Sequence, residues 1–152
     1  MGELFAAIGK NVVLMTALTA WFIAQVLKAI TSTWKDKAFN AERLVGAGGM
    51  PSSHTALVVS LAAAAGYHDG FDSPTFAVTV VLASIVMYDA AGVRRAAGKQ
   101  AKVINKLVHE LTVEHIVKDT RLKELLGHTP LEVLAGAVLG IMIAYAFHHF
   151  YF

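Results

Sequence analysis

The sequence predicts an all-α protein, a polytopic transmembrane helical bundle of about four spans with one further amphipathic or membrane-embedded helix. The 152-residue chain is 56% hydrophobic, with a mean hydropathy of +0.56, which is too apolar for an ordinary soluble domain. Residues 11–27 carry no charge, and residues 131–152 carry only Glu132. Since a spanning helix needs roughly 20 apolar residues, we expect one membrane-embedded domain over residues 1–152.

Four spans are expected, in order, over residues 10–30, 53–67, 74–92 and 130–150. The first is interpreted as a span and not as a removable signal, because no small-residue cleavage site with a polar mature start follows it. The second is short and rich in alanine, which suits close packing inside a bundle better than lipid contact.

Between the third and fourth spans, apolar residues of segment 94–127 alternate with lysines and acids at roughly helical spacing. We expect one amphipathic helix there, lying at the interface or over the bundle. Basic residues in 31–50 and 94–127 predict that both segments face the cytoplasm. The acidic connection 68–73 and both termini are then expected on the other side of a bacterial inner membrane.

Composition excludes several function classes. The chain has no cysteine, which removes disulfides, thiol nucleophiles and cysteine-ligated metals. A formal charge of +2 is too small to indicate a nucleic-acid partner. His109 and His115 lie on different helix faces, whereas the zinc metalloprotease pattern needs histidines four positions apart. We therefore expect no metal and no cofactor.

The first candidate site motif is a glycine turn followed by Pro51, Ser52, Ser53 and His54 at the start of the second span. The first turn of a helix has amides without an intrahelical partner, so it attracts anions. Ser52 or Ser53 can cap the helix, and His54 can exchange a proton with the bound group. The alternative is an ordinary capped helix whose histidine packs or meets water.

The second motif places Glu132 four residues after His128, so that both face one side of a helix. A carboxylate that accepts from one ring nitrogen leaves the other free to attack an electrophile. The alternative is structural, because Thr129, Pro130 and Glu132 also fit a capping box with proline at the first helical position. The two interpretations of Glu132 are compatible.

The predicted topology gathers polar residues at the cytoplasmic ends of the spans, where ionisable groups often mark function. Two histidines among several cations suit phosphoryl transfer without a metal. Asp89 is expected to hold Arg94 or Arg95 in place. The converging residues are Lys28, Arg43, His54, Asp89, Arg94, Arg95 and His128.

These motifs resemble those of the type 2 phosphatidic acid phosphatase superfamily, which is related to vanadium-dependent haloperoxidases, and more closely its small divergent branch. Residues 51–54 are similar to its Pro-Ser-Gly-His motif with serine in place of glycine, and His128 with Glu132 is similar to its final His and Asp. The resemblance implies His128 as nucleophile, Glu132 as its orienting partner and His54 as general acid. The phosphate-binding residues that we infer with it are Lys28, Arg43, Ser52, Ser53, Arg94 and Arg95.

The chain departs from the superfamily pattern in two places. No Arg-Pro follows a lysine, so Lys28 and Arg43 are surrogates, and Arg94 and Arg95 precede His128 by more than thirty positions. An insertion must loop out for these arginines to return to the site.

The expected function is a membrane-embedded phosphatase acting on a phosphorylated lipid. The alternative is a catalytically silent membrane protein that binds or translocates phosphorylated lipids or anions. Superfamily members have about six core helices, so a homodimer that completes the bundle is a further hypothesis.

Overall fold

The computed structural model describes residues 1–36, 49–113 and 127–151, which form helices and turns without any strand. The predicted all-α class is confirmed. The helices are α1 (Gly2–Lys10), α2 (Val12–Asp36), α4 (Ser53–Asp69), α5 (Pro74–Ala91), α6 (Val93–Val113) and α7 (Pro130–Tyr151).

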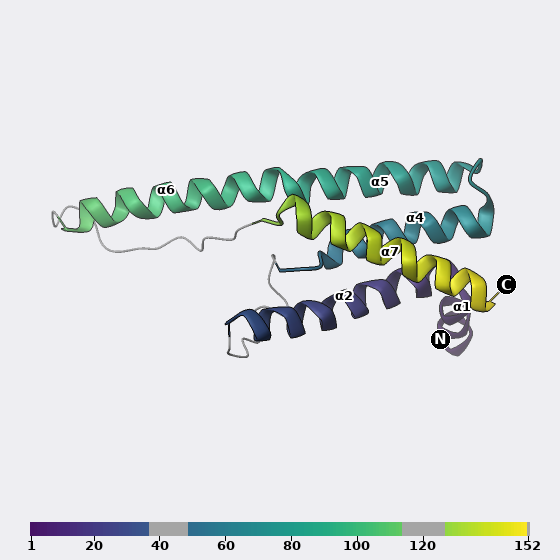
Figure 1. Ribbon diagram of the computed structural model, residues 1–152. Helices are drawn as coiled ribbons and strands as arrows, with labels where there is room; N and C mark the ends of the chain where they lie inside the picture. Colours follow the sequence, from purple (N-terminus) through teal and green to yellow (C-terminus); the bar gives the residue numbers. More distant parts are fainter. Residues whose placement is uncertain (37–48, 114–126, 152) are drawn as a thin grey trace.

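Helix α4 lies at the centre of the bundle and packs against α2, α5 and α7 (Figure 1). Helices α4 and α7 begin at one end of the bundle, the end at which α2 and α5 finish. Both chain termini lie at the opposite end. Residues that precede or follow α2, α4, α5 and α7 therefore meet at one layer, which positions the candidate site.

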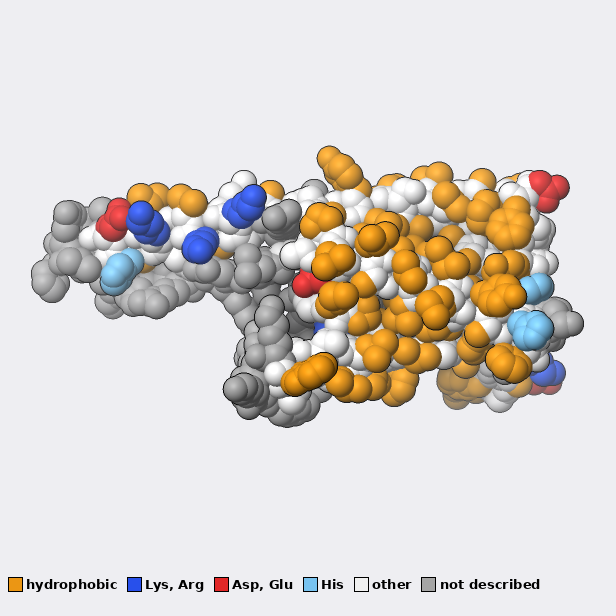
Figure 2. Space-filling model, viewed as in Figure 1, with side chains coloured by type: hydrophobic (Ala, Val, Ile, Leu, Met, Phe, Trp, Pro, Cys, Tyr) orange, Lys and Arg blue, Asp and Glu red, His pale blue; other side chains and the backbone are white. Residues whose placement is uncertain are grey.

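Three stretches of the described helices are long and apolar enough to cross a membrane: Val12–Trp34, Pro74–Glu110 and Pro130–Phe150. With 17 residues, α4 is about 25 Å long, shorter than a full span, and the other three helices surround it. Apolar side chains cover the visible face of the bundle, and charged side chains gather at its ends and along α6 (Figure 2). The protein is therefore an integral membrane protein.

Small residues bring α4 and α7 into close contact. A Cβ atom added to Gly136 would lie 2.4 Å from the carbonyl oxygen of Ser52, and one on Gly140 would lie 2.8 Å from that of Ala56. On the α4 side, Ala56 and Ala64 are buried. The close packing predicted for the second span is confirmed, but the matching glycine pair four residues apart in α7 was missed, although such spacing is a known packing signal.

The start of α4 follows the predicted capping chemistry, and α5 begins in the same way. The Ser52 hydroxyl accepts from the Thr55 N–H at 3.4 Å and caps α4. Ser73 accepts from the Phe76 N–H at 3.1 Å, and Pro74 follows it at the first helical position of α5. Serine caps and proline at the first turn explain why these starts could be predicted.

The first predicted span differs from the structure at its amino-terminal end. A separate helix, α1, ends at Lys10, and α2 begins at Val12. Between them, the Asn11 side-chain oxygen accepts from the Leu14 N–H at 3.0 Å. Asn11 thus caps α2 and breaks the apolar stretch, and every residue of α1 is exposed.

The charged segment forms one amphipathic helix, α6, over its described part, and residues 114–126 lie outside the described residues. Helix α6 extends from the end of α5 beyond the bundle (Figure 1) and packs on no other described helix. Of the two expected positions, the one over the bundle is not found for the described part of this segment, and the one at the membrane interface stays a prediction. The physical reason is that α6 continues the direction of α5 past Gly92 and does not fold back onto the bundle.

Candidate functional site

The candidate site is built where α4 and α7 begin side by side. The backbone N–H of Ser52 donates to the carbonyl oxygen of Glu132 at 3.0 Å, which joins the two helix starts directly. The positive ends of the two helix dipoles therefore lie together, with first-turn amides that have no partner within their own helices. Such an arrangement favours a bound anion.

His128 is the largest fully buried side chain among the described residues, with 2% of its surface exposed. Its Nδ1 lies 3.2 Å from Oε2 of Glu132. Its backbone N–H donates to the carbonyl oxygen of Ala90 at 3.1 Å, which ties the segment that leads into α7 to the end of α5. Because a carboxylate can only accept when ionised, the proton of a neutral ring is assigned to Nδ1, and Nε2 keeps its lone pair.

One carboxylate oxygen of Glu132, Oε2, makes two contacts. Besides lying near His128, Oε2 accepts from the Thr129 N–H at 2.9 Å. In return, the Thr129 hydroxyl accepts from the Glu132 N–H at 3.3 Å. These reciprocal bonds form a capping box. The structural interpretation of Glu132 is therefore present in the fold, and the same bonds hold the carboxylate beside the imidazole.

His54 lies in the first turn of α4 and is exposed. Its ring centroid is 6.1 Å from that of His128, and the ring planes are inclined by 61°. Hydrogen-bonding reach is roughly 3 Å on each side of a bound group. The two imidazoles are thus close enough to act on one small anion.

Lys28 is buried within the membrane-spanning part of α2, with 3% of its surface exposed. Gly49 covers its aliphatic stem, because a Cβ atom on Gly49 would lie 2.8 Å from Lys28 Cγ. Next to it, the Thr31 hydroxyl donates to the carbonyl oxygen of Met50 at 2.6 Å. The segment that leads into α4 therefore packs against the Lys28 side chain. A buried lysine within a membrane-spanning helix is a candidate functional group.

The two serines before His54 are buried, at 0% for Ser52 and 1% for Ser53. The Ser52 hydroxyl accepts from both the backbone N–H and the hydroxyl of Thr55, the latter at 3.0 Å. Ser52 therefore shapes the first turn of α4, whatever further contact it makes with a ligand.

The structure describes the predicted arginines only in part. Arg43 lies outside the described residues. Arg94 and Arg95 belong to the first turn of α6, directly after α5, and their side chains lie outside the described part. The hydrogen bond between Ala90 and His128 shows that the chain leaves and returns at one place. The backbone of both arginines thus starts close to the site despite their distance in sequence.

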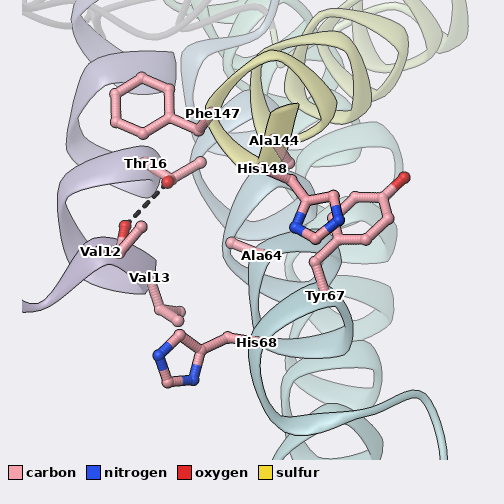
Figure 3. A pocket seen from close by; sticks show the side chains of 9 residues that line it. All are labelled: Val12, Val13, Thr16, Ala64, Tyr67, His68, Ala144, Phe147 and His148. Carbon is pink, nitrogen blue, oxygen red and sulfur yellow. Dashed lines mark hydrogen bonds between the residues drawn. The ribbon is translucent and has the colours of Figure 1, made fainter. Parts of the chain in front are cut away.

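A small cavity lies at the end of the bundle opposite the candidate site, between the start of α2 and the ends of α4 and α7 (Figure 3). It has room for little more than a water molecule. Tyr67 and His148 stack there with ring centroids 4.6 Å apart. Nearby, a hydrogen bond of 2.8 Å between His68 and Asp69 lowers the pKa of the Asp69 carboxyl. None of the predicted site residues lines this cavity.

The described residues hold no group of three or more histidines and carboxylates placed to bind a metal ion. His109 is exposed on α6, and His115 lies outside the described residues.

Comparison with known proteins shows to which family the chain belongs. The model of the family described as "Divergent PAP2 family" matches residues 9–143. The chain belongs to the divergent PAP2 family. Among its relatives, the "Uncharacterized membrane protein YuiD" of Bacillus subtilis (strain 168) is 38% identical over 152 residues, which covers 93% of this chain and 96% of that protein. No solved structure matches the chain.

The expected membership of a divergent phosphatidic acid phosphatase branch is confirmed. The part of the chain that matches the divergent PAP2 family contains every candidate site residue, from Lys28 to Glu132. It ends before Phe147 and His148, two of the residues that line the cavity at the far end.

Proposed function

We propose that this protein is a membrane-embedded phosphatase that hydrolyses a lipid phosphate or diphosphate through a phosphohistidine at His128, without a metal. The observation that carries the proposal is the His128–Glu132 contact of 3.2 Å, with His54 beside it, at the joined starts of α4 and α7. Membership of the divergent PAP2 family supports a phosphatase-like relationship.

The proposed reaction has two steps. In the first, Nε2 of His128 attacks phosphorus, the bond to the lipid oxygen breaks, and His54 donates a proton to that oxygen. In the second, His54 accepts a proton from water, the resulting oxygen attacks phosphorus, and the bond to Nε2 breaks to release phosphate. Glu132 holds the ring and stabilises its positive charge during the first step.

Charge on the transferred phosphoryl group needs positive partners. Lys28, Arg43, Arg94 and Arg95 are the proposed cationic partners, together with Ser52, Ser53 and the first-turn amides of α4 and α7. In a bilayer, the ends of spanning helices lie near the headgroups. A substrate whose phosphate sits at that level and whose chains remain in the membrane fits this position, and the basic segments favour the cytoplasmic side.

The test is phosphate release by the purified protein in lipid nanodiscs with a chelator present. Substrates are phosphatidic acid, phosphatidylglycerophosphate and polyprenyl mono- and diphosphates. His128→Ala is expected to lower the rate by about 10³-fold or more. His149→Ala is the matched control, because His149 is exposed at the far end of α7. Equal rates for His128→Ala and the unmodified protein would contradict the proposal.

The covalent step has its own test. In His54→Ala, hydrolysis of the intermediate should slow, so that label from a ³²P-lipid accumulates on the protein. Phosphohistidine is acid-labile and stable to base, which distinguishes it from phosphoserine. The label should be absent in the double variant His54→Ala with His128→Ala.

A second candidate function is binding or translocation of a phosphorylated lipid or anion without catalysis. The burial of Ser53 favours it, because this side chain occupies the place of a glycine in the motif that the sequence resembles and is 1% exposed. Under this alternative, phosphate release is absent for every lipid of the panel. Vanadate binding is then weakened only modestly by His128→Ala, and it is weakened most by removing Arg43, Arg94 or Arg95.

A homodimer is also a proposal. Mass measurement in mild detergent tests it, and a purely monomeric protein would count against it.

A further inference from the structure

Helix α6 carries an apolar strip that no described helix covers. Val103, Ile104 and Leu107 are 60%, 44% and 53% exposed. Positions three and four apart share one side of a helix, so these side chains form one strip. Among the described elements, α6 packs only on α5, which it follows directly. The strip is therefore open to a partner.

Lysines run along one edge of this strip. Lys99, Lys102 and Lys106 are exposed and follow each other at helical spacing, and Figure 2 shows a row of basic side chains beside apolar ones on α6. Glu110 is the single acidic residue of α6 and lies 3.9 Å from Lys106. An apolar strip edged by lysines is typical of a helix that lies in an anionic membrane interface.

The position of α6 along the chain also places it at the membrane surface. The stretch Pro74–Glu110 has 37 residues and would be about 55 Å long as one straight helix. The hydrocarbon core of a bilayer is about 30 Å thick. Helix α5, with 18 residues, already accounts for most of that thickness. Helix α6 therefore begins where the chain leaves the hydrocarbon core, at the end of the bundle that holds His128.

Helix α1 provides a comparison within the chain. It also exposes large apolar residues, Leu4, Phe5 and Ile8, but its charges are one acid, Glu3, and one base, Lys10. It lies at the other end of the bundle (Figure 1). Among the described helices, a lysine-edged one is thus found at one end of the bundle and not at the other, which is the asymmetry expected if that end faces an anionic leaflet.

We propose that α6 lies flat on an anionic lipid surface. In this state the chain bends at Gly92, between α5 and α6, the strip of Val103, Ile104 and Leu107 enters the interface, and the lysines contact lipid phosphates. The inference concerns a membrane-binding surface and holds whether or not the site at His128 is catalytic.

The test uses the absence of cysteine, which lets a single introduced cysteine be labelled in the full chain. Leu107→Cys places an environment-sensitive fluorophore in the strip. His109→Cys is the matched control, because two residues correspond to roughly 200° around a helix and His109 is exposed. Both proteins are placed, one copy per nanodisc, in phosphatidylcholine with and without phosphatidylglycerol.

We expect the fluorophore at position 107 to shift to the blue and to be quenched by spin-labelled lipid in discs that contain phosphatidylglycerol. The control at position 109 should remain accessible to a water-soluble quencher. Reversing Lys99, Lys102 and Lys106 to glutamate should abolish the effect of phosphatidylglycerol, while circular dichroism shows that helix content is kept.

Three results would overturn the proposal. One is equal water accessibility at positions 107 and 109 in every lipid. Another is a blue shift at position 107 that is absent with one copy per disc and appears with two, since a second copy of the chain would then be the partner. The third is quenching by lipid that does not depend on phosphatidylglycerol or on the three lysines.

Discussion

The backbone N–H of His128 lies 3.1 Å from the carbonyl oxygen of Ala90 and donates a hydrogen bond to it. This contact closes the long excursion that begins after α5 and ends before α7. In the superfamily that the sequence resembles, the arginine of the third motif stands shortly before its histidine. Here the excursion separates them in sequence, and the Ala90–His128 contact brings the start of α6 back to the histidine.

The arginines at the start of α6 should therefore matter for anion binding, although they are distant in sequence. We expect Arg94→Gln combined with Arg95→Gln to weaken vanadate binding by about tenfold or more, since each charge-assisted bond contributes about 1.5–3 kcal/mol. Lys99→Gln, one turn further along α6, should change it by less than about twofold. Equal effects of the two sets of changes would show that only general positive charge matters.

Glu132 allows the cap and the orientation of His128 to be separated. Glutamine can still reach a backbone N–H in a capping box, so Glu132→Gln should leave the melting temperature nearly unchanged. Because it removes the negative charge beside the imidazole, it should lower phosphate release by about 10²-fold or more. Glu132→Ala should lose the same activity and also about 1 kcal/mol of stability. Full activity in Glu132→Gln would leave the carboxylate with a structural role only.

His54 should act on the leaving oxygen, and the choice of substrate can reveal this. An aryl phosphate releases a weakly basic oxygen that needs little protonation, whereas an alkyl phosphate needs it strongly. We expect His54→Ala to lower the single-turnover release of the alcohol from the alkyl substrate by on the order of 10²-fold and the release of the phenol from the aryl substrate much less. A uniform loss with both substrates would indicate that His54 binds or positions the phosphate instead.

The positions of most helices could be predicted because local chemistry marks their ends. Ser52 and Ser73 as caps and Pro74 and Pro130 in first turns mark the starts of α4, α5 and α7. The break at Asn11 was missed, because a polar residue inside an apolar stretch signals a cap only when its side chain folds back onto the next turn. The position of α6 depends on packing between helices, which periodicity does not determine.

The candidate site could be predicted within each helix but not between helices. The spacing of four residues predicts that Glu132 lies near His128, and the two side chains are 3.2 Å apart. The helical reason given for it is wrong, because His128 precedes α7 and the capping box turns the Glu132 side chain back toward it. The 6.1 Å separation of the His54 and His128 rings depends instead on how far α4 and α7 approach each other. That approach is set by Gly136 and Gly140, and their spacing alone does not say which helix packs against them.

Gly136 should therefore control both stability and the geometry of the site. Alanine at this position would place a Cβ atom 2.4 Å from the Ser52 carbonyl oxygen and 3.0 Å from Thr55 Cβ, so α7 must move away from α4. We expect Gly136→Ala to destabilise the protein by about 1–3 kcal/mol, measured by thermal unfolding in detergent. It should also reduce vanadate binding, because Ser52 and Glu132 are joined by the hydrogen bond of 3.0 Å next to this contact.

Val138→Ala is the matched control, since Val138 is 49% exposed on the same helix and its shortening opens no gap against α4. If Gly136→Ala unfolded at the same temperature as Val138→Ala, the close approach of α4 and α7 at Ser52 would not be a constraint on the fold.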